Sequence, residues 1–182
     1  MIYSDHIATL NELSATEGVF TTAQALRMGI PRNALSNGCA SGRIERIVQG
    51  AYRLMGSQET PYDELVAIWK LTAPSKMSYE RIKPSDWDGI AIGGTTAANI
   101  LGIGDFYLSP YRLYTPKRFN TRNKSVQSSM REIAREEVSF IHGVPVTNAS
   151  RTLADLEIDK EDPSLIENAR RDAVERRLIH EI

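Results

Sequence analysis

The hydrophobic positions of the first twenty residues predict a helix followed by a very short strand. Ile7, Leu10 and Leu13 recur at three- and four-residue steps, which is typical of one face of a helix over residues 5–15. Apolar residues 19–20 follow a glycine and have room for only one or two strand positions. The chain is therefore expected to begin with a helix that buries one face.

Two further helices are predicted around a tight turn. The hydroxyl of Thr21 or Thr22 can cap a helix that ends at Gly29, because glycine readily adopts the conformation that stops a helix. Pro31 suits the first turn of the next helix, where its missing N–H is not needed. In that third helix, over residues 31–41, Leu35 and Cys39 are four positions apart and are expected to face inward.

A hairpin is predicted after the third helix. Residues 43–48 and 51–54 are rich in β-branched or aromatic side chains, and Gln49-Gly50 forms the turn between them. Helix, short strand, two close helices and a hairpin is the order of a winged helix-turn-helix. We expect residues 1–56 to form such a DNA-binding domain.

The rest of the chain, residues 57–182, is predicted to be a mixed α/β domain, so that the whole protein belongs to the α+β class. The expected helices cover residues 61–72, residues 95–102 with Thr95 as cap, a segment from about residue 148, and residues 163–178 with Asp162 as cap. The expected strands cover residues 90–92, 111–116, 131–134 and 138–141. Residues 75–89 and 119–129 are predicted to be loops.

Charge is distributed unevenly along the chain, although the net charge is only −1. Residues 27–53 contain five arginines against one glutamate, a local balance of +4. Residues 106–135 contain seven basic residues against one glutamate, or +6, and residues 136–182 contain eleven acids against six bases, or −5. Two basic segments are therefore offset by an acidic tail, a pattern that the net charge of the whole protein hides.

Enzymatic chemistry finds little support in the sequence. The three histidines are scattered and the single cysteine, Cys39, can form neither an internal disulfide nor a zinc site, which fits a reducing cytoplasm. Gly93-Gly94 resembles a phosphate-binding turn but lacks the Lys-Ser/Thr ending. Asp86 and Asp88 have the spacing of paired metal-binding carboxylates, yet such spacing is common in polar loops. We expect no enzyme activity, no metal, no cofactor and no membrane-spanning segment.

The predicted third helix and hairpin carry the side chains that DNA recognition requires. Arginine pairs with guanine, and asparagine with adenine, through two hydrogen bonds in the major groove. The candidate DNA-binding residues are Arg32, Asn33, Ser36, Asn37, Arg43, Arg46, Gln49 and Arg53. The alternative reading is a solvated helix face with incidental arginines.

The sequence resembles the AbiEi family, the antitoxins of type IV toxin–antitoxin (abortive infection) systems. In the first half, GVFTTAQALRMGIPRNALSNGCASGRIERIVQGAYRL is similar to the family's N-terminal winged helix. In the second half, GGTTAANILGIGDF, YRLYTPKR, GVPVTNASRTLADL and LIENARRDAVERRLI are similar to its antitoxin domain. Within these motifs, Arg151 and Asp155 are four residues apart, and we interpret them as an ion pair on one helix face.

The resemblance implies a transcriptional repressor that binds inverted repeats in the operator of its own operon. It also implies that the second domain neutralises a nucleotidyltransferase toxin without forming a stable complex. Two other hypotheses stay open. The basic segment 106–135, with Tyr107, Tyr111, Tyr114 and Phe119, could serve as a nucleic-acid or protein interaction module without specific operator binding. Asp86 and Asp88 could bind a metal ion in an enzyme.

Overall fold

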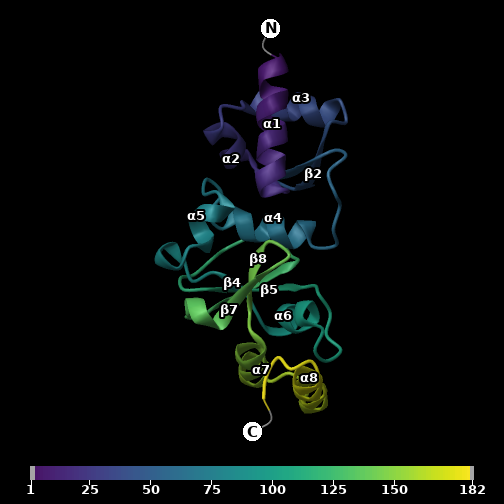
Figure 1. Ribbon diagram of the computed structural model, residues 1–182, viewed down its shortest axis with the longest axis vertical. Helices are drawn as coiled ribbons and strands as arrows, with labels where there is room; N and C mark the ends of the chain where they lie inside the picture. Colours follow the sequence, from purple (N-terminus) through teal and green to yellow (C-terminus); the bar gives the residue numbers. More distant parts are fainter. Residues whose placement is uncertain (1–2, 181–182) are drawn as a thin grey trace. The chain divides into compact units, whose positions relative to one another are not determined.

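The computed structural model describes residues 3–180 and divides into two compact units (Figure 1). The N-terminal unit ends at Asp86, and the C-terminal unit begins at Trp87. Both units combine helices with a β-sheet. The predicted α+β class is therefore confirmed.

The N-terminal unit begins with the elements of a winged helix-turn-helix, in the predicted order. Its helices and strands are α1 (Tyr3–Glu17), β1 (Phe20–Thr21), α2 (Thr22–Arg27), α3 (Arg32–Ala40), β2 (Ile44–Val48), β3 (Ala51–Leu54), α4 (Asp63–Leu71) and α5 (Ser78–Ile82). The three strands form an antiparallel sheet in the order β1-β3-β2. The hairpin of β2 and β3 is the wing, and β1 pairs with its second strand.

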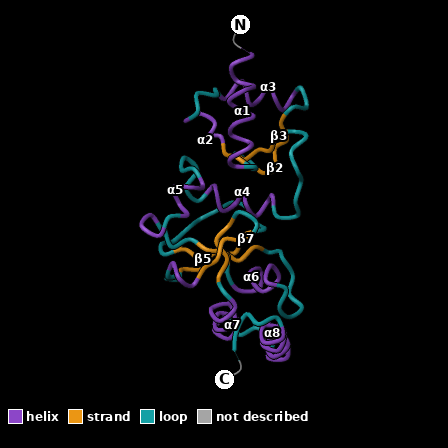
Figure 2. Tube along the Cα trace, in the orientation of Figure 1, coloured by secondary structure: helices purple, strands orange, loops and turns teal. Residues whose placement is uncertain are grey.

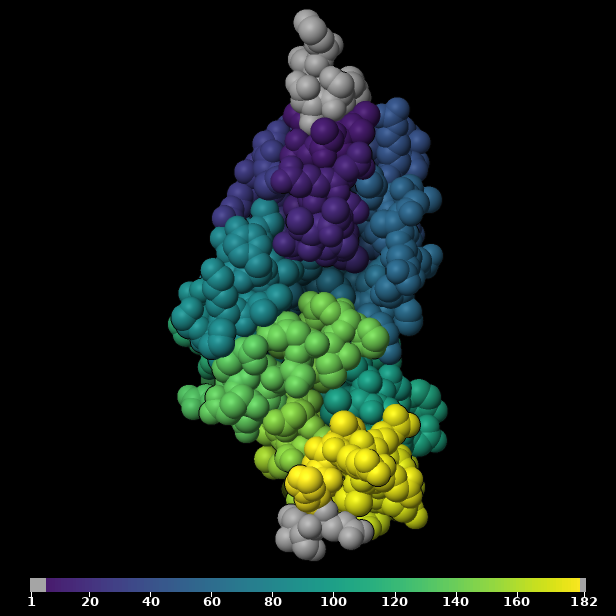
Figure 3. Space-filling view, viewed as in Figure 1, coloured from purple at the N-terminus to yellow at the C-terminus, as the bar shows by residue number. Residues whose placement is uncertain are grey.

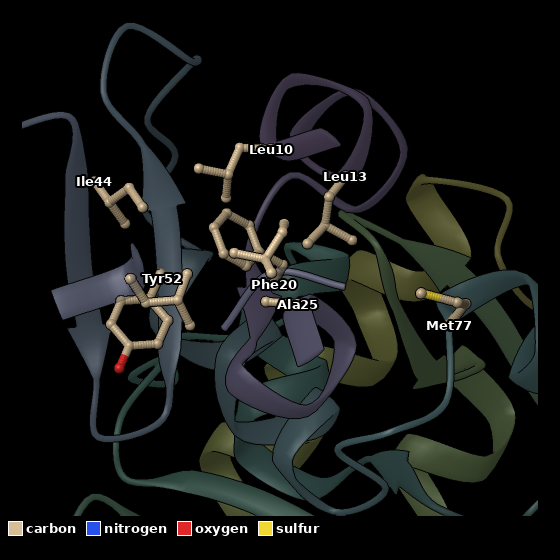
Figure 4. Close-up of a cluster of buried hydrophobic side chains, with 9 residues drawn as sticks. Leu10, Leu13, Phe20, Ala25, Ile44, Tyr52 and Met77 are labelled. Carbon is tan, nitrogen blue, oxygen red and sulfur yellow. The ribbon is translucent and has the colours of Figure 1, made fainter. Parts of the chain in front are cut away.

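The core of this unit lies between α1, the sheet and α2. Figure 4 shows the side chains of Leu10 and Leu13, which come from α1, beside Phe20 and Ala25. Leu35 is the buried residue of α3 and is 1% exposed. The predicted inward positions Leu10, Leu13 and Leu35 are therefore confirmed, whereas Ile7, expected on the same face of α1, is 42% exposed.

Local signals around α2 are those expected from the sequence. Thr21 caps α2 by accepting a hydrogen bond from the Gln24 amide at 3.0 Å, and the Gln24 side chain accepts one from the Thr21 amide at 2.9 Å. Gly29 has a φ of +82°, in the left-handed region that favours glycine. Pro31 is the residue before α3 rather than its first helical position.

The segment after the wing differs from the expectation in two ways. Residues 75–89 were expected to be a loop, but they contain α5 and a 3-10 turn over Pro84–Asp86. The Glu80 carboxylate accepts a hydrogen bond from the Met77 amide, which stabilises the first turn of this short helix. The compact N-terminal unit also continues through α4 and α5 to Asp86, whereas the sequence suggested a boundary near residue 56.

The C-terminal unit is built on a five-stranded mixed sheet. Its elements are β4 (Ala91–Ile92), α6 (Gly94–Leu101), β5 (Tyr111–Thr115), β6 (Val126–Met130), β7 (Val138–Ile141), β8 (Val144–Thr147), α7 (Ala149–Ile158) and α8 (Pro163–Glu175). The strand order is β6-β5-β4-β8-β7, with parallel pairing at β5–β6 and β4–β8. Figure 2 shows the strands of this sheet in orange and the helices in purple. Helices α6, α7 and α8 share one apolar cluster that includes Ala98, Leu153 and Ala169.

The strand expected at residues 131–134 is not there. The strand is β6 instead, five residues earlier, with Val126 opposite Tyr111 and Met130 opposite Thr115. The sequence of β6, VQSSM, is largely polar because an edge strand with little buried surface has no need of alternating hydrophobic positions. Ile133, within the expected range, is buried outside any strand.

Glycines shape the start of α6 in place of the expected threonine cap. The residue before the helix is Gly93, with no side-chain cap, and Thr95 lies inside the helix. A Cβ on Gly93 would lie 1.9 Å from the Tyr114 ring, so the backbone can approach that ring only without a side chain. Gly102, with a φ of +66°, ends α6 as predicted.

The caps of the last two helices match the sequence. The Asn148 side chain accepts a hydrogen bond from the Arg151 amide at 2.9 Å and so begins α7. The Asp162 carboxylate accepts hydrogen bonds from the Ser164 hydroxyl at 2.5 Å and the Ser164 amide at 2.8 Å, and these two bonds, the hydroxyl first, lower the pKa of Asp162. Pro163 occupies the first position of α8, as expected.

Candidate nucleic-acid interface

Helix α3 presents one polar face to solvent. Leu35 is buried on the opposite side, and Cys39 is partly buried against the same core. The predicted recognition residues of this helix, Arg32, Asn33, Ser36 and Asn37, are all exposed. The helix therefore offers a guanidinium, two amides and a hydroxyl on the side away from the core, the groups that read base edges.

Gly38 allows the wing to pack closely on α3. A Cβ at this position would lie 2.5 Å from the Ile44 Cδ1 and 2.9 Å from its Cγ1, closer than real contacts allow. The Arg43 amide also donates a hydrogen bond to the Gly38 carbonyl at 2.9 Å. The sequence analysis did not single out Gly38, yet this residue sets the spacing between the helix and strand β2.

Three of the four predicted wing residues are exposed. Arg43 precedes β2, Arg46 lies within it, and Gln49 is in the turn of the hairpin. The Arg46 guanidinium lies 5.8 Å from the centre of the Tyr52 ring, within the range of a cation–π contact. This contact holds the Arg46 side chain against the wing while its charge remains open to solvent.

Arg53 differs from the other candidates because it is buried and paired. Its side chain is 8% exposed, and its guanidinium contacts the carboxylates of Glu45 at 2.5 Å and Asp63 at 2.8 Å. The hydrogen bond to Glu45 is the main cause that raises the pKa of Arg53. Arg53 thus ties the wing to the start of α4, and we leave it out of the proposed interface.

A hollow of about 590 Å³ lies beside α3. Its floor includes Leu10 from α1 and Ile44 from β2, and its rim carries Asn33, Asn37 and Arg43. Figure 3 shows α1 on the visible face of the N-terminal unit. Asn33, Asn37 and Arg43 belong both to this rim and to the candidate DNA-binding residues. A ligand bound along α3 would therefore also contact the hollow.

A buried polar cluster holds the winged helix to α4. The Lys70 ammonium lies 2.6 Å from the Glu17 carboxylate and also donates hydrogen bonds to the carbonyls of Glu17 and Val19. Glu17 accepts further hydrogen bonds from Gln24 and Ser78. Burial lowers the pKa of Lys70, and the nearby Glu17 carboxylate opposes that shift. In the sequence, one lysine within the apolar run of α4 is the visible sign of this cluster.

A second polar cluster lies in the C-terminal unit around Asp155, which is fully buried. The Arg151 Nε donates to Asp155 at 3.0 Å, as the four-residue spacing predicted, and the Arg131 guanidinium contacts the same carboxylate at 2.6 Å. Arg131 also pairs with Asp159, and the Tyr114 hydroxyl donates to Asp159 at 3.2 Å. Burial is the main cause that raises the pKa of Tyr114. These residues bind one another and connect α7 to the sheet.

Within residues 3–180, no group of three or more histidine, cysteine or acidic side chains is arranged to hold a metal ion. Asp86 is exposed, and the Asp88 carboxylate accepts a hydrogen bond from the Ile90 amide, which is a local turn contact. The same part of the chain has no helix that is both long and apolar enough to cross a bilayer.

Comparison with known proteins agrees with this geometry at the N-terminus. A family described as "Transcriptional regulator, AbiEi antitoxin" matches residues 9–54, which cover most of α1 and continue to the end of the wing. This segment is therefore similar to the AbiEi antitoxin family. The resemblance noted in the sequence is confirmed there, and the AbiEi family is one of regulators and antitoxins rather than a class of enzymes. No curated protein sequence matches the chain.

The fold is also found among solved structures, three chains of which match. One is the crystal structure of the RV2827C protein from Mycobacterium tuberculosis. It aligns with 94% of this chain and 70% of its own, with a TM-score of 0.52 and 14% sequence identity. At that identity the match shows a shared fold alone, over most of the chain.

Proposed function

We propose that this AbiEi-type protein is a cytoplasmic transcriptional repressor that binds inverted repeats in the operator of its own operon. The observation that carries the proposal is the exposed polar face of α3, where Arg32, Asn33, Ser36 and Asn37 stand opposite the buried Leu35. In a helix-turn-helix protein, the second helix of the motif enters the major groove. These four side chains would contact base edges there.

The wing supplies the rest of the proposed interface. Arg43, Arg46 and Gln49 would bind the neighbouring phosphates or the minor groove. Phosphate contacts position a protein on DNA, whereas contacts with base edges select the sequence. We therefore assign selectivity to α3 and most of the affinity to the wing. Catalysis has no part in this account, and neither does a cofactor or metal.

Binding of the purified protein to duplex DNA from upstream of its own gene tests the proposal, with a scrambled duplex as reference. The double variant Arg32→Ala, Asn37→Ala should lose the preference for the operator. A matched control is Arg171→Ala, Asn168→Ala, which removes the same two side-chain types from α8. The control should bind like the wild type. Operator preference that survives in the α3 variant would contradict the assignment of the recognition helix.

We further propose that the protein acts as the antitoxin of a nucleotidyltransferase toxin, without forming a stable complex with it. The description of the matching family as antitoxins supports this role. Co-expression with a nucleotidyltransferase encoded in the same operon is the test. Growth should be restored by the wild type and by the Arg32→Ala, Asn37→Ala variant alike, since neutralisation is assigned to the C-terminal unit. Failure of the wild type to restore growth would overturn the antitoxin proposal alone.

A further inference from the structure

The C-terminal unit carries a strongly basic loop between β5 and β6. This cationic loop, residues 116–125, has the sequence PKRFNTRNKS and contains no acidic residue. Its four cations, Lys117, Arg118, Arg122 and Lys124, are all exposed. Four positive charges within ten residues create a local field that attracts a polyanion.

The other basic residues of segment 106–135 are already engaged inside the unit. Arg112 pairs with Glu161 at 3.1 Å, and Arg131 pairs with the buried Asp155. Arg135 lies over the Phe140 ring at 5.1 Å. Across residues 3–180, no carboxylate forms an ion pair with any of the four loop cations. Within segment 106–135, the positive charge that no nearby carboxylate compensates is therefore concentrated in the cationic loop.

The cationic loop is held in shape by its own hydrogen bonds. The Thr115 hydroxyl donates to the Lys117 carbonyl at 2.6 Å, and the Ser128 hydroxyl donates to the Phe119 carbonyl at 3.0 Å. The Asn123 side chain accepts from the Ser125 amide at 2.9 Å. A loop fixed in this way loses less conformational entropy when it binds a ligand than a flexible tail would.

We propose that the cationic loop binds the phosphodiester backbone of duplex DNA, independently of base sequence. Its side chains fit this partner: two lysines, two arginines, and the polar Asn120 and Thr121 are donors typical of phosphate contacts. The proposal deepens the repressor function and rests on it in part, because the loop would add affinity for DNA while α3 supplies the sequence selectivity. The loop contact itself stands even if α3 proves not to select a sequence.

Two other partners fit the loop less well. A protein interface normally has an apolar or aromatic centre, but the cationic loop exposes no large apolar side chain, and Phe119 is partly buried. Single-stranded RNA is normally recognised by stacking of bases on aromatic rings. Of the four rings that suggested RNA binding, Tyr111 and Tyr114 are buried at 5% and 1% exposure, and Phe119 is partly buried. Tyr107 is 86% exposed, but it precedes β5 and lies outside the cationic loop, so one ring alone is open to base stacking.

The test measures affinity for duplex DNA against salt concentration, with full-length protein. The loop variant replaces Lys117, Arg118, Arg122 and Lys124 by glutamine. The control variant replaces four exposed cations elsewhere in the same unit by glutamine, namely Lys160, Arg171, Arg176 and Arg177. Both variants change the net charge equally. A milder variant, Arg122→Gln with Lys124→Gln, guards against loss of folding, which circular dichroism would reveal.

Each phosphate contact contributes about 0.9 to the slope of log affinity against log salt. The loop variant should therefore lower the slope by about 2 to 4 on operator and scrambled duplex alike, and the milder variant by about half as much. The control variant should leave the slope within about 0.5 of wild type. Equal slopes for the loop variant and wild type would overturn the proposal, as would tighter loop-dependent binding to single-stranded RNA than to duplex DNA.

This design separates the loop from the recognition helix. If the wild type shows no operator preference but its binding to any duplex depends on the loop, the repressor proposal fails and the loop proposal holds. If operator preference is present and the loop variant keeps the full salt slope, the loop proposal fails and the repressor proposal holds.

Discussion

The Glu17 carboxylate and the Lys70 ammonium lie 2.6 Å apart and are both buried, so the last turn of α1 is joined to α4 by an ion pair out of contact with water. The side chains are only 2% and 3% exposed. Buried charges are costly unless each is fully partnered, and here hydrogen bonds to Ser78, Gln24 and two carbonyls supply the remaining partners. The pair therefore explains why α4 belongs to the N-terminal unit.

Breaking this pair should be costly. Lys70→Met leaves the Glu17 carboxylate buried without its cation, and we expect a loss of about 3 to 5 kcal/mol of unfolding free energy in urea titrations. Adding Glu17→Gln to Lys70→Met should recover part of the loss. Arg170→Met serves as control, since Arg170 pairs with Glu157 on the surface, and should cost less than about 1 kcal/mol. A Lys70→Met protein as stable as the control would show that the pair is not structurally important.

Gly38→Ala should be destabilising, although alanine favours helices. The added methyl group would meet Ile44 at 2.5 Å, and we expect a net cost of about 1 to 3 kcal/mol in the same titrations. In an Ile44→Val background the nearest atom, Cδ1, is gone, so the same substitution should cost less. An unchanged cost in that background would mean that the contact between α3 and β2 is not the cause.

Asp155→Asn should destabilise the C-terminal unit strongly. The substitution keeps the shape of the side chain but leaves Arg131 and Arg151 with a neutral partner in a buried site, at a cost of about 3 to 5 kcal/mol. Glu157→Gln, an exposed position on the same helix, is the control and should be close to neutral. Thermal unfolding measures the stability of both variants. A melting temperature for Asp155→Asn equal to that of Glu157→Gln would contradict the structural role of Asp155.

Acid should weaken the contact between α2 and α5. The Arg27 guanidinium lies 2.6 Å from the Glu80 carboxylate, and the hydrogen bond from Arg27 lowers the pKa of Glu80 from 4.5 to about 2. A carboxylate whose pKa is lower in the folded state stabilises the fold above its unfolded pKa, and this stabilisation disappears as the pH falls toward the folded pKa. The wild type should thus lose more stability between pH 5 and about 2 than Glu80→Gln does. Melting temperatures of the wild type and Glu80→Gln that fall by the same amount over this pH range would contradict the prediction.

The sequence predicted the winged helix well because its signals are local. Thr21 with Gln24, Gly29, and the Gln49-Gly50 turn each specify a cap or a turn from neighbouring residues alone. Strand β6 and helix α5 were missed because tertiary contacts determine them. The polar sequence of β6 is a strand because it pairs with β5, and α5 forms where Met77 is buried against the N-terminal core.

The sequence predicted only part of the candidate site, because some of its residues are determined by tertiary contacts. The exposure of the α3 residues follows from the position of Leu35 in the helical repeat, and the structure agrees with it. By contrast, the burial of Arg53 depends on Asp63, ten positions further along the chain, and the pairing of Arg131 depends on Asp155. Counting charges along the sequence cannot distinguish such paired arginines from free ones.

Selection of preferred duplexes from a randomised pool, followed by sequencing, tests most directly whether α3 reads DNA bases. The wild type should yield a defined sequence with inverted symmetry. Arg32→Ala should yield the same sequence except at one guanine in each half-site, where its preference should fall by about 1 to 3 kcal/mol. An identical preference at every position for Arg32→Ala, or no defined sequence for the wild type, would contradict the account.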